Sequence, residues 1–222
     1  MTARERLAIA AIACAAIAVA GAEAPADVMQ VNDREEIAAN DSYDWSVLGV
    51  PDTVAGTNFD IDSVNGLTAN VMTPLNSLVV QQPTNWAGGF ADDDFGLFTG
   101  GGDTLTLDFA MPVQAVGAHI FTDLAGPFTA TLTAFDADGE ELGMADVTGT
   151  AVARPNEAPF LGLTSDAFDI SEVVFEADNI SSNDDGFAIN EVSVNVIPAP
   201  ATGTAALVML GAIAAQRRRT RA

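Results

Sequence analysis

Polar and apolar residues alternate along several short segments of the chain. The alternation is clearest at 104–109, 128–135 and 191–196, and it is typical of a β-strand with one face toward a core and the other toward solvent. Further segments of this kind lie at 67–72, 77–81, 113–122, 141–147, 160–164 and 172–176. The pattern therefore predicts roughly nine short strands.

Turn-forming residues separate these segments at short intervals. They are Val64-Asn65-Gly66, Gly100-Gly101-Gly102-Asp103 and Asp136-Ala137-Asp138-Gly139. The Asp-Gly pair of the last run favours a tight hairpin between 128–135 and 141–147. Only 33–39 reads as a short helix, with Asn32 or Asp33 as its cap. The sequence thus predicts an all-β fold, an antiparallel β-sandwich with a jelly-roll arrangement.

Both ends of the chain break this pattern with apolar runs that predict terminal helices. Residues 1–22 carry Arg4 and Arg6, an apolar run over 7–20 and small residues up to Ala22, the three parts of a secretory signal peptide. The run of about 14 apolar residues is shorter than the ~20 that a membrane-spanning helix needs. We therefore expect cleavage after Ala22 rather than an uncleaved anchor. The only cysteine, Cys14, would be removed with the signal.

The C-terminal segment 198–222 has the order of a sorting signal. A short motif is followed by an apolar stretch over 205–215 and then by an arginine cluster, which the positive-inside bias would hold in the cytoplasm. The residues that define it are Pro198, Pro200, Thr202, Gly203, Arg217, Arg218 and Arg219. The apolar part spans only about 16 Å as a helix, too little for a durable anchor.

This tail resembles the PEP-CTERM sorting signal of bacterial surface and matrix proteins, which implies processing by an exosortase. It departs from that motif because Pro198-Ala199-Pro200 lacks the central glutamate. The segment 199–203 also resembles the sortase motif L-P-x-T-G, with Ala199 in place of leucine. An ordinary C-terminal membrane helix is the third alternative. The expected partners are therefore the secretion machinery and an exosortase-like or sortase-like enzyme.

Charge separates the ends from the middle of the chain. The protein carries a formal charge of −23 from 31 acidic residues and 8 arginines, with no lysine. The expected domain, 23–197, keeps only Arg34 and Arg154 against 30 acidic residues, a formal charge of −28. Nucleic acid is therefore not an expected partner, because phosphate binding needs clustered basic side chains. An acidic, lysine-free surface suits a protein that is exposed to salt.

A second resemblance covers most of 33–196. The motifs that carry it, in chain order, are Asp44-Trp45, Leu48-Gly49, Asn65-Gly66-Leu67, Asn85-Trp86-Ala87-Gly88-Gly89-Phe90, Val116-Gly117-Ala118-His119-Ile120, Phe128-Thr129-Ala130, Ala134-Phe135-Asp136, Phe160-Leu161-Gly162-Leu163 and Phe187-Ala188-Ile189-Asn190. They look like those of secreted bacterial β-sandwich domains that often carry PEP-CTERM tails. The resemblance implies an architecture and a destination, and it implies no catalytic residue.

Nothing in the sequence predicts catalysis. Any two of 30 carboxylates could lie close together by chance, so a pair of them does not indicate a glycosidase. The single histidine, His119, falls in an apolar segment without a neighbouring nucleophile motif. We expect it to be a structural residue of the sandwich.

Calcium is the cofactor that the composition favours, because Ca²⁺ prefers six to eight oxygen ligands. The candidate ligands are Asp60, Asp62, Asp184, Asn190 and Glu191. Other acidic runs lie at 92–94 and 136–138, and none has the spacing of an EF-hand loop. The alternative is a solvated acidic surface without bound metal.

Sugar binding by a sandwich usually needs an exposed aromatic ring beside polar groups. Trp86 and Asn85 lie in a Gly-rich and Asp-rich stretch, and we take them as the candidate sugar-binding residues; Tyr43 and Trp45 are the other aromatic candidates. The sequence thus predicts an exported, non-enzymatic surface or matrix protein. The alternative is a calcium-assisted carbohydrate-binding module for extracellular polysaccharide.

Overall fold

The computed structural model describes residues 27–152, 154–179 and 186–197. The strands are β1 (Val28–Val31), β2 (Asp41–Tyr43), β3 (Val54–Asp62), β4 (Thr68–Gln81), β5 (Phe95–Phe98), β6 (Thr104–Val113), β7 (Ala115–Thr122), β8 (Gly126–Phe135), β9 (Glu141–Ala151), β10 (Phe160–Ser165), β11 (Ile170–Asn179), β12 (Phe187–Asn190) and β13 (Val192–Asn195). The described residues also form two one-turn 3₁₀ helices, η1 (Arg34–Ile37) and η2 (Trp45–Leu48).

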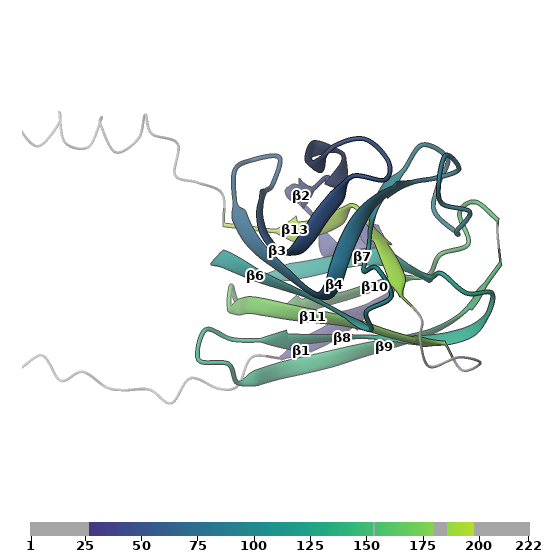
Figure 1. The fold of residues 1–222 in the computed structure, drawn as a ribbon. Helices are drawn as coiled ribbons and strands as arrows, with labels where there is room; N and C mark the ends of the chain where they lie inside the picture. Colours follow the sequence, from purple (N-terminus) through teal and green to yellow (C-terminus); the bar gives the residue numbers. More distant parts are fainter. Residues whose placement is uncertain (1–26, 153, 180–185, 198–222) are drawn as a thin grey trace, which may run out of the picture.

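All strand pairs are antiparallel, and the strands form two layers (Figure 1). We call the layer β3-β4-β6-β11-β8-β9 the front sheet. The back layer consists of β1, β10, β7, β13 and β2, and β12 and β5 connect β7 to β4. The predicted all-β, antiparallel class is confirmed, and the jelly-roll arrangement stays a prediction. The predicted terminal helices lie outside the described residues.

The core lies between the two layers because each strand turns its apolar phase inward. Leu107 of β6, Leu132 of β8 and Phe175 of β11 meet Val116 and Leu161 of the back layer, and all are fully buried. The opposite phase of the same strands is polar and faces solvent. The period of two in the sequence therefore sets which side chains build the core.

The side chain of Gln30 joins the two ends of this strand path. Its amide nitrogen donates to the backbone oxygen of Asp146 over 2.7 Å, and its amide oxygen accepts from the backbone nitrogen of the same residue over 3.3 Å. The edge strands β1 and β9 thus lie side by side, linked by a side chain instead of a ladder. This link covers two edges that would otherwise offer unpaired backbone groups.

The predicted hairpin turn is confirmed. The Oδ1 atom of Asp136 accepts from the backbone nitrogens of Asp138 and Glu140, each over 2.9 Å. Gly139 has a φ of 79°, a left-handed conformation that favours glycine. The strands β8 and β9 then pair from residue 126 to residue 151.

Several boundaries differ from the predictions. The segments 67–72 and 77–81 form one strand, β4, which runs through Thr73 and Pro74. The predicted strand 191–196 is observed as β13, which begins at Val192, and Glu191 separates it from β12. The predicted helix at 33–39 is a single 3₁₀ turn, and the Asp33 side chain does not cap it. The strands β1, β2, β3, β5 and β12 were not predicted, because each is too short or too irregular for a clear alternation.

Candidate functional site

A row of side chains crosses the outer face of the front sheet. The register pairs Asp60 with Asn70, Asn70 with Asp108, Asp108 with Glu172, and Glu172 with Phe135. Cross-strand partners on one face lie about 4.5–5.5 Å apart at their Cβ atoms. The row therefore brings residues from five strands into one line on the surface.

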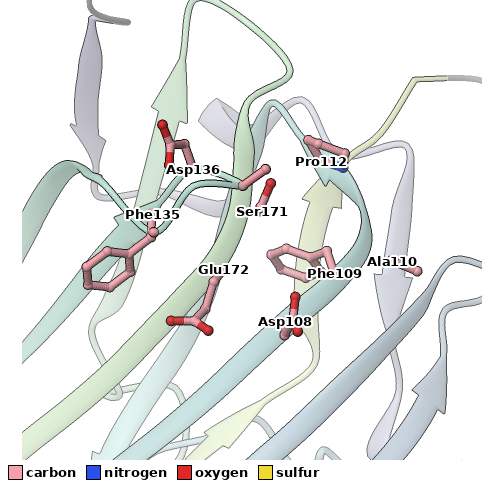
Figure 2. Close-up of a pocket in the computed structure, with 10 residues that line it drawn as sticks. Asp108, Phe109, Ala110, Pro112, Phe135, Asp136, Ser171 and Glu172 are labelled. Carbon is pink, nitrogen blue, oxygen red and sulfur yellow. The ribbon is translucent and has the colours of Figure 1, made fainter.

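A groove of about 370 Å³ opens at one end of this row (Figure 2). The ring of Phe135 and the carboxylates of Asp108, Asp136 and Glu172 line it, together with the hydroxyl of Ser171. The backbone of β11 is irregular here, because its pairing with β6 shifts between Ile170 and Glu172. Such a bulge bends the strand and re-aims the side chains beside it.

Two like charges stand on neighbouring strands in the groove. Glu172 and Asp108 are direct cross-strand partners, and Figure 2 shows their carboxylates on neighbouring strands at the same level of the sheet. Burial, and then the negative charge of Asp108, raise the pKa of Glu172 above its usual range. Like charges directly opposite in a sheet are unfavourable, so this pair is held at a cost in stability.

The rest of the outer face is also acidic. Its alternating polar phase carries Asp62 on β3, Asp146 on β9, and Glu176 and Asp178 on β11, all of them exposed. The two arginines of the described residues pair elsewhere, Arg34 with Glu191 and Arg154 with Glu157. Within the described part of the chain, the outer face of the front sheet therefore carries carboxylates without a basic partner.

A second polar cluster surrounds Asn190, at the end of β12. The Arg34 guanidinium donates from Nη2 to the Asn190 side-chain oxygen over 3.0 Å, and from Nη1 to Glu191 over 3.0 Å and to the Ser193 hydroxyl over 2.9 Å. The amide nitrogen of Asn190 donates to Asp94 over 3.0 Å. These hydrogen bonds connect η1 to β12 and β13.

His119 lies beside this cluster. Its Nδ1 atom is 2.9 Å from the backbone oxygen of Ala158, and a carbonyl only accepts, so Nδ1 carries the hydrogen. Burial is the main cause that lowers the pKa of His119. Its backbone nitrogen donates to the side chain of Asn190. Arg34, Asp94, His119, Asn190 and Glu191 together line a cavity of about 210 Å³.

The structure places the predicted sugar-binding residues inside the protein. Trp86 is 6% exposed and packs against the rings of Phe90 and Phe98. Tyr43 and Trp45 are fully buried. The prediction of a stacking platform at Trp86 is therefore wrong, because its ring has no exposed face for a sugar.

Asn85 has a local structural role. Its side-chain oxygen accepts from the backbone nitrogen of Gln81 over 2.7 Å, and its nitrogen donates to Asp52 over 2.8 Å. These bonds hold the loop that follows β4. The polar side chain next to Trp86 thus stabilises the turn that carries the tryptophan inward.

The predicted calcium ligands do not gather at one place. Asp60 and Asp62 lie on β3 and accept hydrogen bonds from Asn70 and Thr68, while Asn190 and Glu191 hold Arg34. Asp184 lies outside the described residues. Among the residues that the structure describes, no three His, Cys, Asp or Glu side chains come close enough to hold a metal ion.

Of the residues that line the groove, the sequence singled out only Asp136, in the acidic run 136–138. Phe135, Asp108 and Glu172 each stand at a polar-phase position of a predicted strand, so their outward direction was readable. An aromatic ring in the solvent-facing phase of β8, among threonines, was the one available signal. Their proximity depends on the register of three strands that are distant in the sequence, which the alternation does not specify.

Comparison with known proteins identifies no family. No family model and no curated protein matches the chain. Among the described residues, no helix has the length and hydrophobicity needed to cross a membrane.

Solved structures align with this chain only at low identity and low TM-score. A DUF4465 family protein from Bacteroides caccae aligns with 75% of this chain and 100% of its own, at 14% identity and a TM-score of 0.40. TmCBM61, solved with β-1,4-galactotriose, aligns over 78% of this chain and 86% of its own, at 12% identity and a TM-score of 0.29. A mutant of the carbohydrate-binding module CBM29-2 aligns over 79% and 100%, at 10% identity and a TM-score of 0.27.

Proposed function

We propose that this chain is an exported, non-enzymatic surface or matrix protein whose β-sandwich binds extracellular polysaccharide in the groove beside Phe135. The observation that carries the proposal is the lining of this groove, where an aromatic ring stands next to hydrogen-bond acceptors on an open sheet face. Sugars present apolar C–H faces and hydroxyl donors side by side. The ring and the carboxylates of the groove complement these two features.

The shape of the groove suits a polymer. It lies on the outer surface of the front sheet rather than in an enclosed cavity, and the acidic row continues from it toward β3. A chain of sugar units can therefore follow the row without having to end inside the protein. Extended polar contacts of this kind position a ligand, while the Phe135 ring supplies apolar contact area.

Export and sorting complete the proposal and rest on the sequence. The signal peptide 1–22 would direct secretion, and the tail 198–222 would be processed by an exosortase-like or sortase-like enzyme at the membrane. The intervening domain 23–197 would then reach the surface or the matrix, where polysaccharide is available. Calcium assistance is the part of this proposal for which the described residues contain no gathered ligand set.

A glycan array tests the binding. The full-length protein is applied with and without calcium, next to Phe135→Ala and to Leu75→Ala. Leu75→Ala removes an exposed apolar side chain from β4, at a position that does not line the groove. We expect binding that Phe135→Ala weakens about tenfold and that Leu75→Ala leaves unchanged. No binding in either condition would contradict the proposal, and release of reducing ends from a bound polymer would contradict its non-enzymatic part.

Mass spectrometry of the protein from its native host tests export and sorting. We expect a mature N-terminus at residue 23 and a C-terminus within 198–203. A cytosolic protein that retains residues 1–22 would overturn this part. An intact C-terminus in the membrane fraction would favour simple anchorage by the tail.

A further inference from the structure

We propose that the polysaccharide bound in this groove carries free amino groups, and that the Asp108–Glu172 pair receives them. This inference rests on the proposed function and names the chemical class of its ligand. It starts from the hydrogen-bonding groups that the groove offers. Asp108 and Glu172 have no hydrogen-bond or ion-pair partner for their side chains among the described residues, whereas Asp136 is occupied by the turn that follows β8.

The groups of the groove that have no partner among the described residues accept hydrogen bonds, and the two carboxylates among them are both negative. Two ionised carboxylates only accept, and the Ser171 hydroxyl accepts as readily as it donates. An ammonium group has three donors and a positive charge. It matches this set in number and sign, while a sugar hydroxyl offers a single donor and no charge.

Repulsion between Asp108 and Glu172 favours the binding of a cationic group. Asp108 and Glu172 repel each other across the two strands, and the raised pKa of Glu172 reflects this repulsion together with its burial. A cation placed between the two carboxylates replaces the repulsion with two charge-assisted hydrogen bonds. The groove thus gains more from a cationic ligand than from a neutral one of the same shape.

The acidic surroundings of the groove repel a negatively charged ligand. Asp60, Glu176, Asp178 and Asp146 stand on the same face as the pair. A polymer of uronic acids would bring carboxylates against this face and be repelled. Calcium would need six to eight oxygen ligands, and the pair with Ser171 offers too few in one place.

The test compares three short, water-soluble polymers with the full-length protein at about pH 6, where most amines are charged and most carboxylates are ionised. The polymers are a chitosan of a few sugar units, its fully N-acetylated counterpart of the same length and an alginate of similar length. We expect binding to chitosan to exceed binding to the acetylated polymer by about tenfold or more, and no binding to alginate. Titration calorimetry at several salt concentrations gives the affinities.

A matched pair of variants separates recognition from general attraction, because any polycation is drawn to a domain of charge −28. Asp108→Asn/Glu172→Gln removes two charges from the groove, and Asp92→Asn/Asp93→Asn removes two exposed charges from the loop before β5. We expect the groove variant to lose at least about tenfold in chitosan affinity, and the loop variant to lose less than about twofold.

The outcomes distinguish the two proposals. Equal losses in the two variants would overturn the inference, because the attraction would then be unspecific. Binding to the acetylated polymer as tight as to chitosan would also overturn it while supporting the proposed function, provided that Phe135→Ala weakens that binding. If no polymer binds here and no glycan binds on the array, the proposed function itself is wrong.

Discussion

The guanidinium of Arg34 donates a hydrogen bond of 3.0 Å to the side-chain oxygen of Asn190, across 156 residues of sequence. It joins η1, near the start of the domain, to the end of β12. The same guanidinium lies 5.9 Å above the ring of Phe160 on β10. One side chain therefore connects the first turn, a strand of the back layer and the last strands.

Replacement of Arg34 should show how much this connection stabilises the fold. Its side chain is 29% exposed, whereas that of Arg154 is 72% exposed and lies 3.6 Å from Glu157. We expect Arg34→Gln to lower the free energy of unfolding by about 2 kcal/mol, because it leaves partly buried acceptors unpaired. Arg154→Gln should change it by less than about 0.5 kcal/mol. Urea unfolding of both variants measures the difference, and equal effects would show that the Arg34 network is not stabilising.

Glu172→Gln should stabilise the protein at neutral pH. The raised pKa of Glu172 means that the folded state holds this proton more tightly than the unfolded state. The cost of ionising Glu172 therefore appears as the pH rises above its ordinary pKa and persists at pH 7. We expect a gain of roughly 0.5 kcal/mol at neutral pH.

The pH dependence and a control identify the source of this gain. In acid, the glutamic acid is neutral like glutamine, so the difference between Glu172→Gln and the wild type should vanish. Glu140→Gln removes an exposed charge from the β8–β9 turn and corrects for the high net charge. If Glu140→Gln stabilises the protein as much as Glu172→Gln does, the effect does not arise from the Asp108 pair.

His119 should make the stability fall in mild acid. Burial and Arg34 lower its pKa, while the bond to Ala158 and the charges of Asp94 and Glu35 act in the opposite direction. The unfolded state therefore binds this proton at a higher pH than the folded state. The contribution of neutral His119 to the free energy of unfolding is fully present above the pKa of the unfolded state, about 6.5. It is lost as the pH falls below that value.

The variant His119→Asn tests this assignment. Asparagine keeps a nitrogen donor near the Ala158 oxygen and does not titrate. We expect the free energy of unfolding of the variant to depend less steeply on pH between neutrality and about pH 5. Identical slopes for the variant and the wild type would mean that His119 does not contribute to the pH dependence.

Gly88 lies against the buried edge of Trp86. A Cβ atom at this position would stand 1.9 Å from the indole Nε1 and 2.6 Å from Cδ1, and the ring is held between Phe90 and Phe98. Gly88→Ala should therefore destabilise the protein by about 1–3 kcal/mol. Thermal unfolding measures the loss.

A double variant attributes this loss to the indole. Trp86→Phe removes the Nε1 atom, which has no partner among the described residues, and it leaves space for the added methyl group. We expect Gly88→Ala to cost less in the Trp86→Phe background than in the wild type. Strictly additive costs would place the strain elsewhere in the loop.

The sequence indicated much of the strand content and the direction of many side chains. The alternation along 104–109 and 128–135 is confirmed by β6 and β8, in which Leu107 and Leu132 are buried and Asp108 and Phe135 stand in the opposite phase. The Asp-Gly turn at 138–139 was also readable, because few residue pairs suit a tight hairpin. These features are local, and local geometry depends on neighbouring residues.

The burial of Trp86 and the fate of the acidic residues could not be read in this way. Whether an aromatic ring in a Gly-rich loop faces solvent depends on what packs over it, and here Phe90 and Phe98 do. Asn190 and Glu191 were predicted as calcium ligands, yet they bind Arg34 because η1 folds against them. The sequence contains no sign of that contact, since its partners are more than 150 residues apart.

The sequence by itself determined the charge and the polar phase in which Asp108, Phe135 and Glu172 stand. It also predicts the two terminal signals. Only the tertiary structure decided that these three residues share one groove. The reason is the register of β6, β11 and β8: a shift by one residue would turn each side chain to the other face of the sheet. That register depends on the packing of the whole core, which no short segment of the sequence specifies.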